Sequence, residues 1–345
     1  MGLTLTLIEY FTGEKSTKLV HTFTHLGNRE LAGMGYGGAE FFDAGYDVIA
    51  FKTNVDHWYQ DIPKHIFETV RARTLDKGYL RRITYGGSMG GFGALAFSRH
   101  LEADTALVFS PQISLGEAFD KRWDSYLNKF EWAYPINSDT FSEKIHIIAI
   151  YDPMDIDAKH IDLLKDYVVH EKFTPIQIPF AGHATPQYLS EIKILRRLVL
   201  QLAEIHSADG FDIYSERKNS WSYHFHLGLN LLHNKKYQSS LRVFKRALIF
   251  KPIDADTHRL ISTCLQYLRD YTGSTVAAKQ AVNLSPTFQN YDHLSYQQML
   301  SGEWGSALLS IESALLLSPD NEGLIQRKEH LVHKLRDKGS CNTGS

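Results

Sequence analysis

Cysteine is scarce in this chain, which has only two in 345 residues. Cys264 and Cys341 lie far apart in the sequence, so the chain cannot form the disulfide framework of small secreted proteins. Charge of one sign is scarce too, because the formal net charge is only −2. These shortages favour a globular protein with a nearly neutral surface and argue against nucleic acid as a partner.

Long apolar runs are also missing. No stretch reaches the roughly 18 consecutive apolar residues of a membrane-spanning helix, and the N-terminal "MGLTLTLIEYFTGEKS" lacks the regions of an export signal. We therefore expect a cytoplasmic protein without membrane association. The 17 histidines include no H-E-x-x-H pattern and accompany no cysteine pair, so we expect no metal site and no cofactor.

The chain does contain two halves with different periodicities. In the first half, short apolar runs alternate with helix-length stretches, which is typical of a mostly parallel sheet flanked by helices. The expected strands are Leu3–Glu9, Lys18–Thr24, Tyr46–Phe51, Leu80–Tyr85, Thr105–Phe109, Lys144–Tyr151 and Pro175–Phe180, and the expected helices include Ile62–Asp76, Gly91–His100, Ala158–His170 and Gln187–Ile205. The sequence thus predicts an α/β domain over residues 1–208 and a linker over residues 209–220.

A repeat marks the second half. The segments "RALIFKP", "QAVNLSP" and "SALLLSP" end at Pro252, Pro286 and Pro319, which are 34 and 33 residues apart. With this period, residues 221–338 resemble a tetratricopeptide-repeat (TPR) domain of three repeats and a cap helix. The resemblance implies an all-α solenoid that binds a protein or peptide partner. Residues 339–345 are expected to form a flexible tail.

A serine bracketed by glycines is the strongest chemical signal. Gly86-Gly87-Ser88-Met89-Gly90 matches G-x-S-x-G, after the strand-like "LRRITY" and before the helix-like "GFGALAFSRH". A serine in a sharp strand-to-helix turn projects from the carboxyl edge of the sheet, and glycines let neighbouring chain pass closely. The N–H of Met89, at the helix start, would point toward a developing oxyanion.

A serine hydroxyl needs a base and a group that orients the base. In "PIQIPFAGHATP", His183 follows a predicted strand and could accept the serine proton. In "IHIIAIYDPMDID", a strand ends in a cluster of carboxylates, of which Asp152 and Asp155 are the candidates for the orienting acid. The chain order is therefore serine, aspartate, histidine.

These motifs, taken in this order, resemble the α/β-hydrolase family, and most closely its esterase branches, over about residues 18–205. The resemblance implies Ser88 as nucleophile, His183 as general base and acid, and Asp155 as the orienting acid. Asp155 is preferred over Asp152 because the family turn usually places a glycine and two residues between the strand and its acid.

The second oxyanion donor is expected in the loop after an early strand. In "FTHLGNRE", the N–H groups of His25 and Leu26 are both candidates beside Met89, and the inserted leucine leaves the choice open. No H-G-G-G sequence is present, so the lipase subtype that uses it is not indicated.

The segment 112–143 is too long for a plain connection, and the resemblance implies a lid over the active site. Its Trp123, together with Trp58 and Tyr59 after an earlier strand, predicts a substrate cleft walled by aromatic rings. The alternative is that these rings form the lid's own apolar core.

The sequence therefore predicts a serine hydrolase that cleaves a small-molecule carboxylic ester through a seryl acyl-enzyme, with TPR repeats that recruit a partner. One alternative is a non-catalytic interaction scaffold on a hydrolase fold. The others are a thioesterase, a peptidase or an acyltransferase that uses the same three residues.

Overall fold

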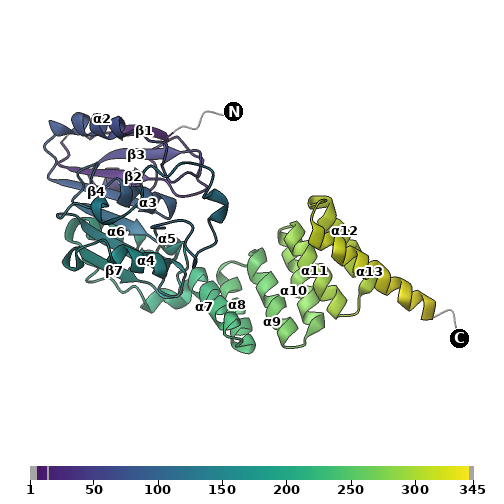
Figure 1. Ribbon diagram of the computed structural model, residues 1–345. Helices are drawn as coiled ribbons and strands as arrows, with labels where there is room; N and C mark the ends of the chain where they lie inside the picture. The colour runs from purple at the N-terminus through teal and green to yellow at the C-terminus, as the bar shows by residue number, and fades with distance from the viewer. Residues whose placement is uncertain (1–5, 14, 342–345) are drawn as a thin grey trace. The chain divides into compact units, whose positions relative to one another are not determined.

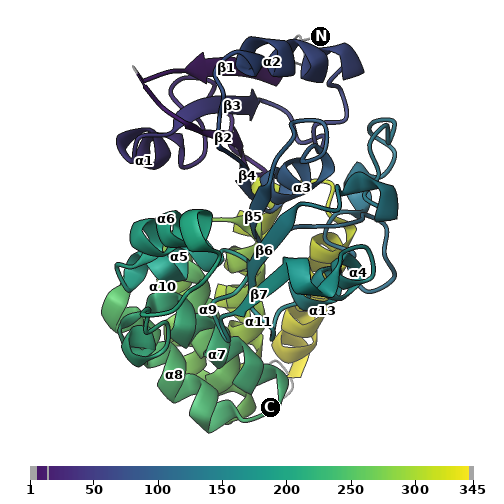
Figure 2. The ribbon, with the colours of Figure 1, turned by 90° about the vertical axis from the view of Figure 1, so that its left-hand side faces the viewer.

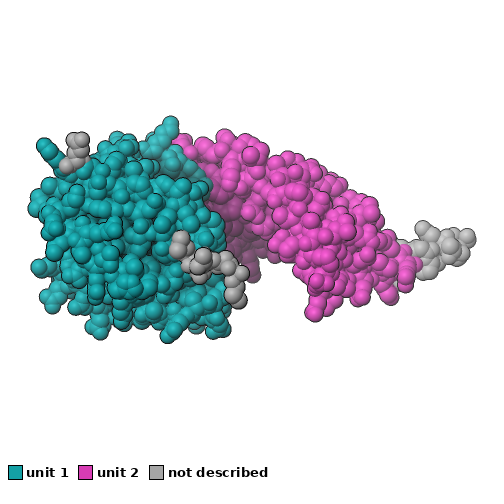
Figure 3. Space-filling view, turned by 90° about the horizontal axis from the view of Figure 1, so that it is seen from above, with its two compact units in different colours: residues 1–217 teal, residues 218–345 magenta. Residues whose placement is uncertain are grey.

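The computed structural model describes residues 6–13 and 15–341, with side chains described as far as Arg336. The chain divides into two compact units, Met1–Arg217 and Lys218–Ser345, coloured separately in Figure 3. The boundary lies inside the segment 209–220 that the sequence predicts as a linker. None of the helices in the described ranges combines the length and apolar character needed to span a lipid bilayer.

Unit 1 is built on a seven-stranded sheet with the order β1-β3-β2-β4-β5-β6-β7, seen in Figures 1 and 2. The strands are β1 (Thr6–Phe11), β2 (Lys18–Phe23), β3 (Asp47–Thr53), β4 (Arg81–Gly87), β5 (Thr105–Phe109), β6 (His146–Tyr151) and β7 (Phe173–Gln177). Only β1 is antiparallel to its neighbour. The mostly parallel sheet is confirmed, although Leu3 of the first expected strand lies outside the described residues.

Apolar residues at consecutive positions explain why the central strands are covered on both faces. Strand β6 has four such residues in a row, Ile147 to Ile150, and all are fully buried. Helices α1 (Gly38–Asp43) and α6 (Leu195–Ile205) cover one face, and α3 (Met89–Ala96) and α4 (Asp157–Lys165) cover the other, as Figure 2 shows.

Two further helices complete unit 1. Helix α2 (Lys64–Leu75) follows β3, and α5 (Thr185–Glu191) directly precedes α6. The sequence predicts one continuous helix over residues 187–205, whereas the structure has two. Lys193 lies between them at a φ of 61°, a left-handed conformation that no α-helix continues through.

Unit 2 consists of three helical hairpins and one further helix. The hairpins are α7 (Trp221–His233) with α8 (Tyr237–Phe250), α9 (Ala255–Tyr267) with α10 (Tyr271–Leu284), and α11 (Phe288–Leu300) with α12 (Trp304–Leu317), followed by α13 (Glu322–Cys341). These pairs confirm the predicted helical repeats. Residues 339–341 of the predicted tail belong to α13, and residues 342–345 lie outside the described part of the chain.

Small residues let the two helices of each hairpin approach closely. A Cβ at Gly228 would lie 2.6 Å from the Phe244 ring. The hydroxyl of Ser240 donates to the Gly228 carbonyl at 2.8 Å, and that of Ser274 donates to the Ser262 carbonyl at 2.8 Å. The same 12-residue spacing thus brings a serine to a carbonyl in two successive hairpins, as expected of a repeated unit.

Candidate active site

Ser88 occupies a strained turn between β4 and α3. Its φ of 55° and ψ of −123° lie in a region that residues with a side chain rarely adopt. The N–H of Ser88 donates to the Phe109 carbonyl at 2.8 Å, which ties the turn to β5. Two glycines are required here, because a Cβ at Gly86 would lie 2.2 Å from the Gly90 carbonyl oxygen and one at Gly90 would lie 2.3 Å from the Phe23 carbonyl oxygen.

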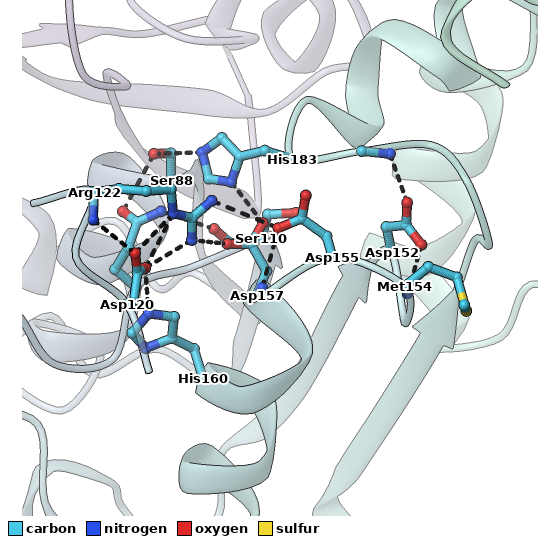
Figure 4. Close-up of polar contacts among 12 residues, drawn as sticks. Ser88, Ser110, Asp120, Arg122, Asp152, Met154, Asp155, Asp157, His160 and His183 are labelled. Carbon is cyan, nitrogen blue, oxygen red and sulfur yellow. Dashed lines mark hydrogen bonds and ion pairs between the residues drawn. The ribbon is translucent and has the colours of Figure 1, made fainter. Parts of the chain in front are cut away.

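His183 lies between the serine and a buried carboxylate, as Figure 4 shows. Its Nε2 is 3.0 Å from Ser88 Oγ, and its Nδ1 is 2.5 Å from Asp157 Oδ2. His183 comes from the loop after β7, and Asp157 is the first residue of α4. An ionised carboxylate accepts but cannot donate, so Nδ1–H donates to Asp157 and the Nε2 of the neutral ring faces Ser88 Oγ without a proton.

The prediction that Asp155 orients the histidine is wrong, because Asp157 occupies that place. The carboxylate of Asp155 accepts the N–H of Asp157 at 3.2 Å, so it is engaged in the turn that starts α4. The pKa of Asp155 is raised by its burial and by the neighbouring Asp157 charge. The sequence alternative, Asp152, accepts N–H groups of the two adjoining loops, those of Met154 at 2.8 Å, Phe180 at 3.0 Å and Gly182 at 2.8 Å.

The Asp157 carboxylate has a second partner that the sequence did not reveal. Arg122, from the segment between β5 and β6, places its guanidinium 2.6 Å from Asp157 Oδ1. Burial raises the pKa of Asp157, but the hydrogen bond to His183 and the charges of His183 and Arg122 outweigh it and hold the pKa below its usual value. In the sequence, Arg122 looks like an ordinary surface charge in "FDKRWD", and no local signal sets it apart.

The predicted oxyanion donors lie around the serine. The N–H of Met89, in the first turn of α3, has no acceptor within its own helix. His25 and Leu26 follow β2 and line a cavity together with Ser88. The carboxylate of Asp56 holds their loop, because it accepts the Gly27 N–H at 2.9 Å and pairs with Arg29 at 2.6 Å.

The cavity beside Ser88 measures about 310 Å³. Its polar side chains are Ser88, His25, His183 and Gln187. The rest of its wall is mainly apolar and includes Leu26, Tyr36, Phe109, Trp123, Ala184 and Pro186. A second cavity of about 250 Å³ shares Tyr36 and Pro186 with the first and lies between α1 and α6. The Tyr36 ring stacks on Tyr85 at 5.3 Å between ring centroids.

Of the three predicted substrate-binding residues, the structure brings only Trp123 to the cavity wall. The prediction for Trp58 and Tyr59 is wrong, because both side chains are fully buried. Their φ angles of 49° and 58° belong to a tight turn that directs the rings into the core. Trp58 packs against Trp123, Tyr126, Phe130 and Trp132, so these rings of the 112–143 segment join the main apolar core of unit 1 and do not form a separate core of their own.

Unit 2 has an open groove of about 360 Å³ across α9, α11 and α13. It is lined by Arg259 of α9, by Gln289, Asp292, His293 and Tyr296 of α11, and by Arg327 of α13. Arg327 pairs with Asp292, and Arg259 pairs with Asp256 at 2.9 Å. Across the described residues, no three His, Cys, Asp or Glu side chains are grouped as metal ligands would be.

No family model and no curated protein matches this chain. Solved structures similar to about a third of it include several TPR domains. The first TPR of Spaghetti, bound to an HSP90 peptide, is 13% identical with a TM-score of 0.33 over 34% of this chain and 95% of its own. The Sgt2 TPR domain from Aspergillus fumigatus is 11% identical with a TM-score of 0.33 over 35% and 82%. Because these TM-scores are low, the evidence for helical repeats is the three helical hairpins of this chain.

Proposed function

We propose that unit 1 is a serine hydrolase that cleaves a carboxylic ester through an acyl-enzyme on Ser88. The observation that carries this proposal is the His183 ring, which lies 3.0 Å from the Ser88 hydroxyl and 2.5 Å from Asp157. The strained G-x-S-x-G turn and the parallel sheet with one antiparallel edge strand support it, since both resemble the α/β-hydrolase family.

Acylation begins when Ser88 Oγ attacks the ester carbonyl carbon while His183 Nε2 takes the hydroxyl proton. Asp157 accepts the hydrogen bond from Nδ1–H and stabilises the imidazolium that forms. The N–H of Met89, with that of His25 or Leu26, donates to the tetrahedral oxyanion. When the intermediate collapses, the carbon–oxygen bond to the alcohol breaks and His183 gives the alcohol its proton.

Deacylation repeats these steps with water as the nucleophile. His183 Nε2 takes a proton from water, and the hydroxide attacks the acyl carbon. The bond to Ser88 Oγ then breaks, the serine regains its proton, and a carboxylic acid leaves. The mainly apolar cavity wall suits an uncharged acyl group, which is why a carboxylic ester is the proposed substrate class.

A fluorophosphonate probe tests the proposal, because it phosphonylates an activated serine hydroxyl and leaves an unactivated one largely unmodified. The full chain should be labelled at Ser88, and Ser88→Ala should abolish both labelling and ester turnover. Ser114→Ala, which removes a serine hydroxyl of the neighbouring segment, is the matched control and should keep both. A folded wild type that is neither labelled nor active would contradict the hydrolase proposal and favour a non-catalytic interaction scaffold.

Substrate comparison separates the enzymes that share these three residues. Matched oxygen-ester, thioester and peptide substrates should rank with the oxygen ester first. Product analysis with added alcohols should give free acid rather than a new ester. Faster thioester or peptide cleavage, or transfer to the alcohol, would replace the esterase assignment while keeping the seryl acyl-enzyme.

We propose a second function for unit 2, the binding of an extended peptide in the groove across α9, α11 and α13. Arg259 of α9 and Arg327 of α13 both line the groove, so an acidic peptide could bind along it. A peptide library should yield acidic sequences that lose binding to Arg259→Glu or Arg327→Glu. The control is Arg242→Glu, on α8 and outside the groove. Equal binding by all three variants would reject this site.

A further inference from the structure

We propose that Arg122 is a positioning residue that holds Asp157 in the orientation in which it accepts the Nδ1–H of His183. The proposal deepens the serine hydrolase function above and rests on it. Arg122 makes no hydrogen bond to Ser88 and does not itself line the cavity, so its action on the reaction passes through Asp157.

The argument begins with the burial of Asp157. Its side chain is 0% exposed, so water cannot solvate its two oxygens. A buried carboxylate needs a donor for each oxygen, because an unpaired buried charge is strongly unfavourable. His183 Nδ1–H donates to Oδ2 at 2.5 Å, and the Arg122 guanidinium donates to Oδ1 at 2.6 Å. The two contacts together fix the plane of the carboxylate.

Arg122 is itself held from several sides. Its Nε donates to Asp120 Oδ1 at 2.9 Å, and the guanidinium nitrogen that reaches Asp157 also lies 2.7 Å from Asp120 Oδ2. The guanidinium lies over the Trp123 ring, 5.4 Å from its centroid. These contacts leave the guanidinium little freedom, as a group that positions another must have.

A second contact joins the same two segments. The Nε2 of His160, on α4, donates to Asp120 at 3.1 Å, while its Nδ1 accepts the N–H of Ile113 at 3.4 Å. His160 is fully buried, and this burial lowers its pKa. Because Nδ1 accepts an N–H and Nε2 donates to Asp120, the ring is neutral and its orientation is fixed. Asp120–His160 and Arg122–Asp157 therefore join the 112–143 segment to α4 at two points, as Figure 4 shows.

Charge gives Arg122 a second effect on His183. The charged and titratable groups around the pair are Asp120 and Arg122 from the segment, Asp152 and Asp155 from the turn after β6, His160 from α4, and His25 across the cavity. Carboxylates dominate this set, and Arg122 is the permanent cation within it. Without Arg122, the uncompensated carboxylates would stabilise the imidazolium form of His183.

The experiment compares full-length Arg122→Gln and Arg122→Lys with the wild type. For Arg122→Gln we expect kcat on p-nitrophenyl acetate to fall about tenfold at pH 7 with KM changed less than about threefold. The acid limb of its kcat/KM profile should move to higher pH by about one unit, because the variant removes a positive charge that lies a few ångströms from the imidazolium. Arg122→Lys retains the charge and should keep the limb at the wild-type position.

Two controls separate positioning from general destabilisation. Arg71→Gln removes another arginine–carboxylate pair of unit 1, to Glu102 at 2.7 Å on the exposed surface, and should change neither kcat nor the limb. If Arg122→Gln does not fold, Asp120→Asn loosens the hold on Arg122 and removes one negative charge. It should then lower kcat and move the limb to lower pH.

A folded Arg122→Gln with the kcat and pH profile of the wild type would overturn the proposal. So would a loss of activity that matches the unfolded fraction with no shift of the acid limb. Histidine-selective NMR of Arg122→Gln and the wild type across the same pH range compares the protonation of the His183 ring directly and does not require turnover. If the wild type proves inactive and unlabelled, the proposed hydrolysis fails, while the NMR titration still decides whether Arg122 acts on His183.

Discussion

The carboxylate of Asp157 lies 2.5 Å from His183 Nδ1, whereas that of Asp155 accepts the N–H of Asp157 at 3.2 Å. Asp157→Asn cannot carry the same charge toward His183 and favours the wrong ring tautomer, so kcat should fall by about 10³–10⁴-fold. Asp155→Asn keeps the acceptor for the turn and should cost less than about tenfold. Steady-state kinetics on one ester substrate compares the two variants.

Circular dichroism of both variants would verify that each is folded before its kinetics are interpreted. The opposite ranking, with Asp155→Asn the more damaged enzyme, would assign the orienting role to Asp155 and require a rearranged turn before α4.

Tyr36 stands between the cavity at Ser88 and the second cavity, which measure about 310 and 250 Å³. Removing its ring in Tyr36→Ala should join them and admit a longer acyl chain. We expect the ratio of kcat/KM for an octanoyl ester to that for an acetyl ester to rise about tenfold, since added methylenes gain contact in an apolar pocket. Tyr214→Ala, outside both cavities, should leave the ratio unchanged, and an unchanged ratio in Tyr36→Ala would argue against the partition.

Gly90 allows α3 to start against the end of β2. A Cβ at this position would lie 2.3 Å from the Phe23 carbonyl oxygen, so Gly90→Ala should lower the free energy of unfolding of unit 1 by about 2–3 kcal/mol. Gly305→Ala is the matched control, since no atom lies within 4 Å of its added Cβ and alanine favours the helix. Urea unfolding of both variants measures the difference, and equal stability would contradict the close approach.

His21 makes the stability of unit 1 depend on pH. Burial lowers its pKa to about 3, although the hydrogen bond with the Ile83 carbonyl works the other way. Below about pH 6.5, His21 binds a proton in the unfolded chain but stays neutral in the folded protein. The free energy of unfolding should therefore fall by about 1.4 kcal/mol per pH unit from this group as the pH drops from 6.5 toward 3.

His21→Gln should lose that contribution, so its urea midpoint should depend less steeply on pH than that of the wild type. His65→Gln, at an exposed histidine of α2, should keep the wild-type slope. Parallel slopes for His21→Gln and the wild type would indicate that His21 is protonated in the folded protein.

Local patterns were sufficient to predict the features that depend on local geometry. The apolar runs of the central strands and the spacing of Pro252, Pro286 and Pro319 predicted a mostly parallel sheet and helical hairpins. The glycines around Ser88 identified its turn, because only glycine fits where backbone atoms approach so closely. Chain order was enough to indicate His183, since the ends of parallel strands share one edge.

Features that depend on packing between distant segments were not predicted. Asp155 and Asp157 lie two residues apart, and only the start of α4 decides which one faces His183. Trp58 and Tyr59 were predicted to line the substrate cleft, but they lie in the core. Aromatic rings are common in both places, and the sequence alone does not separate the two. The partnership of Arg122 with Asp157 spans 35 residues and leaves no local pattern.

Arg122 and Trp123 are consecutive, yet one contacts the Asp157 carboxylate and the other lines the cavity. Any insertion or deletion that reshapes the pocket near Trp123 would also displace the guanidinium. The residues around Trp123 therefore cannot be replaced without also affecting the contact to Asp157. A redesign of the pocket for substrates of another acyl-chain length or with aromatic groups would have to retain Asp120, Arg122 and His160 together.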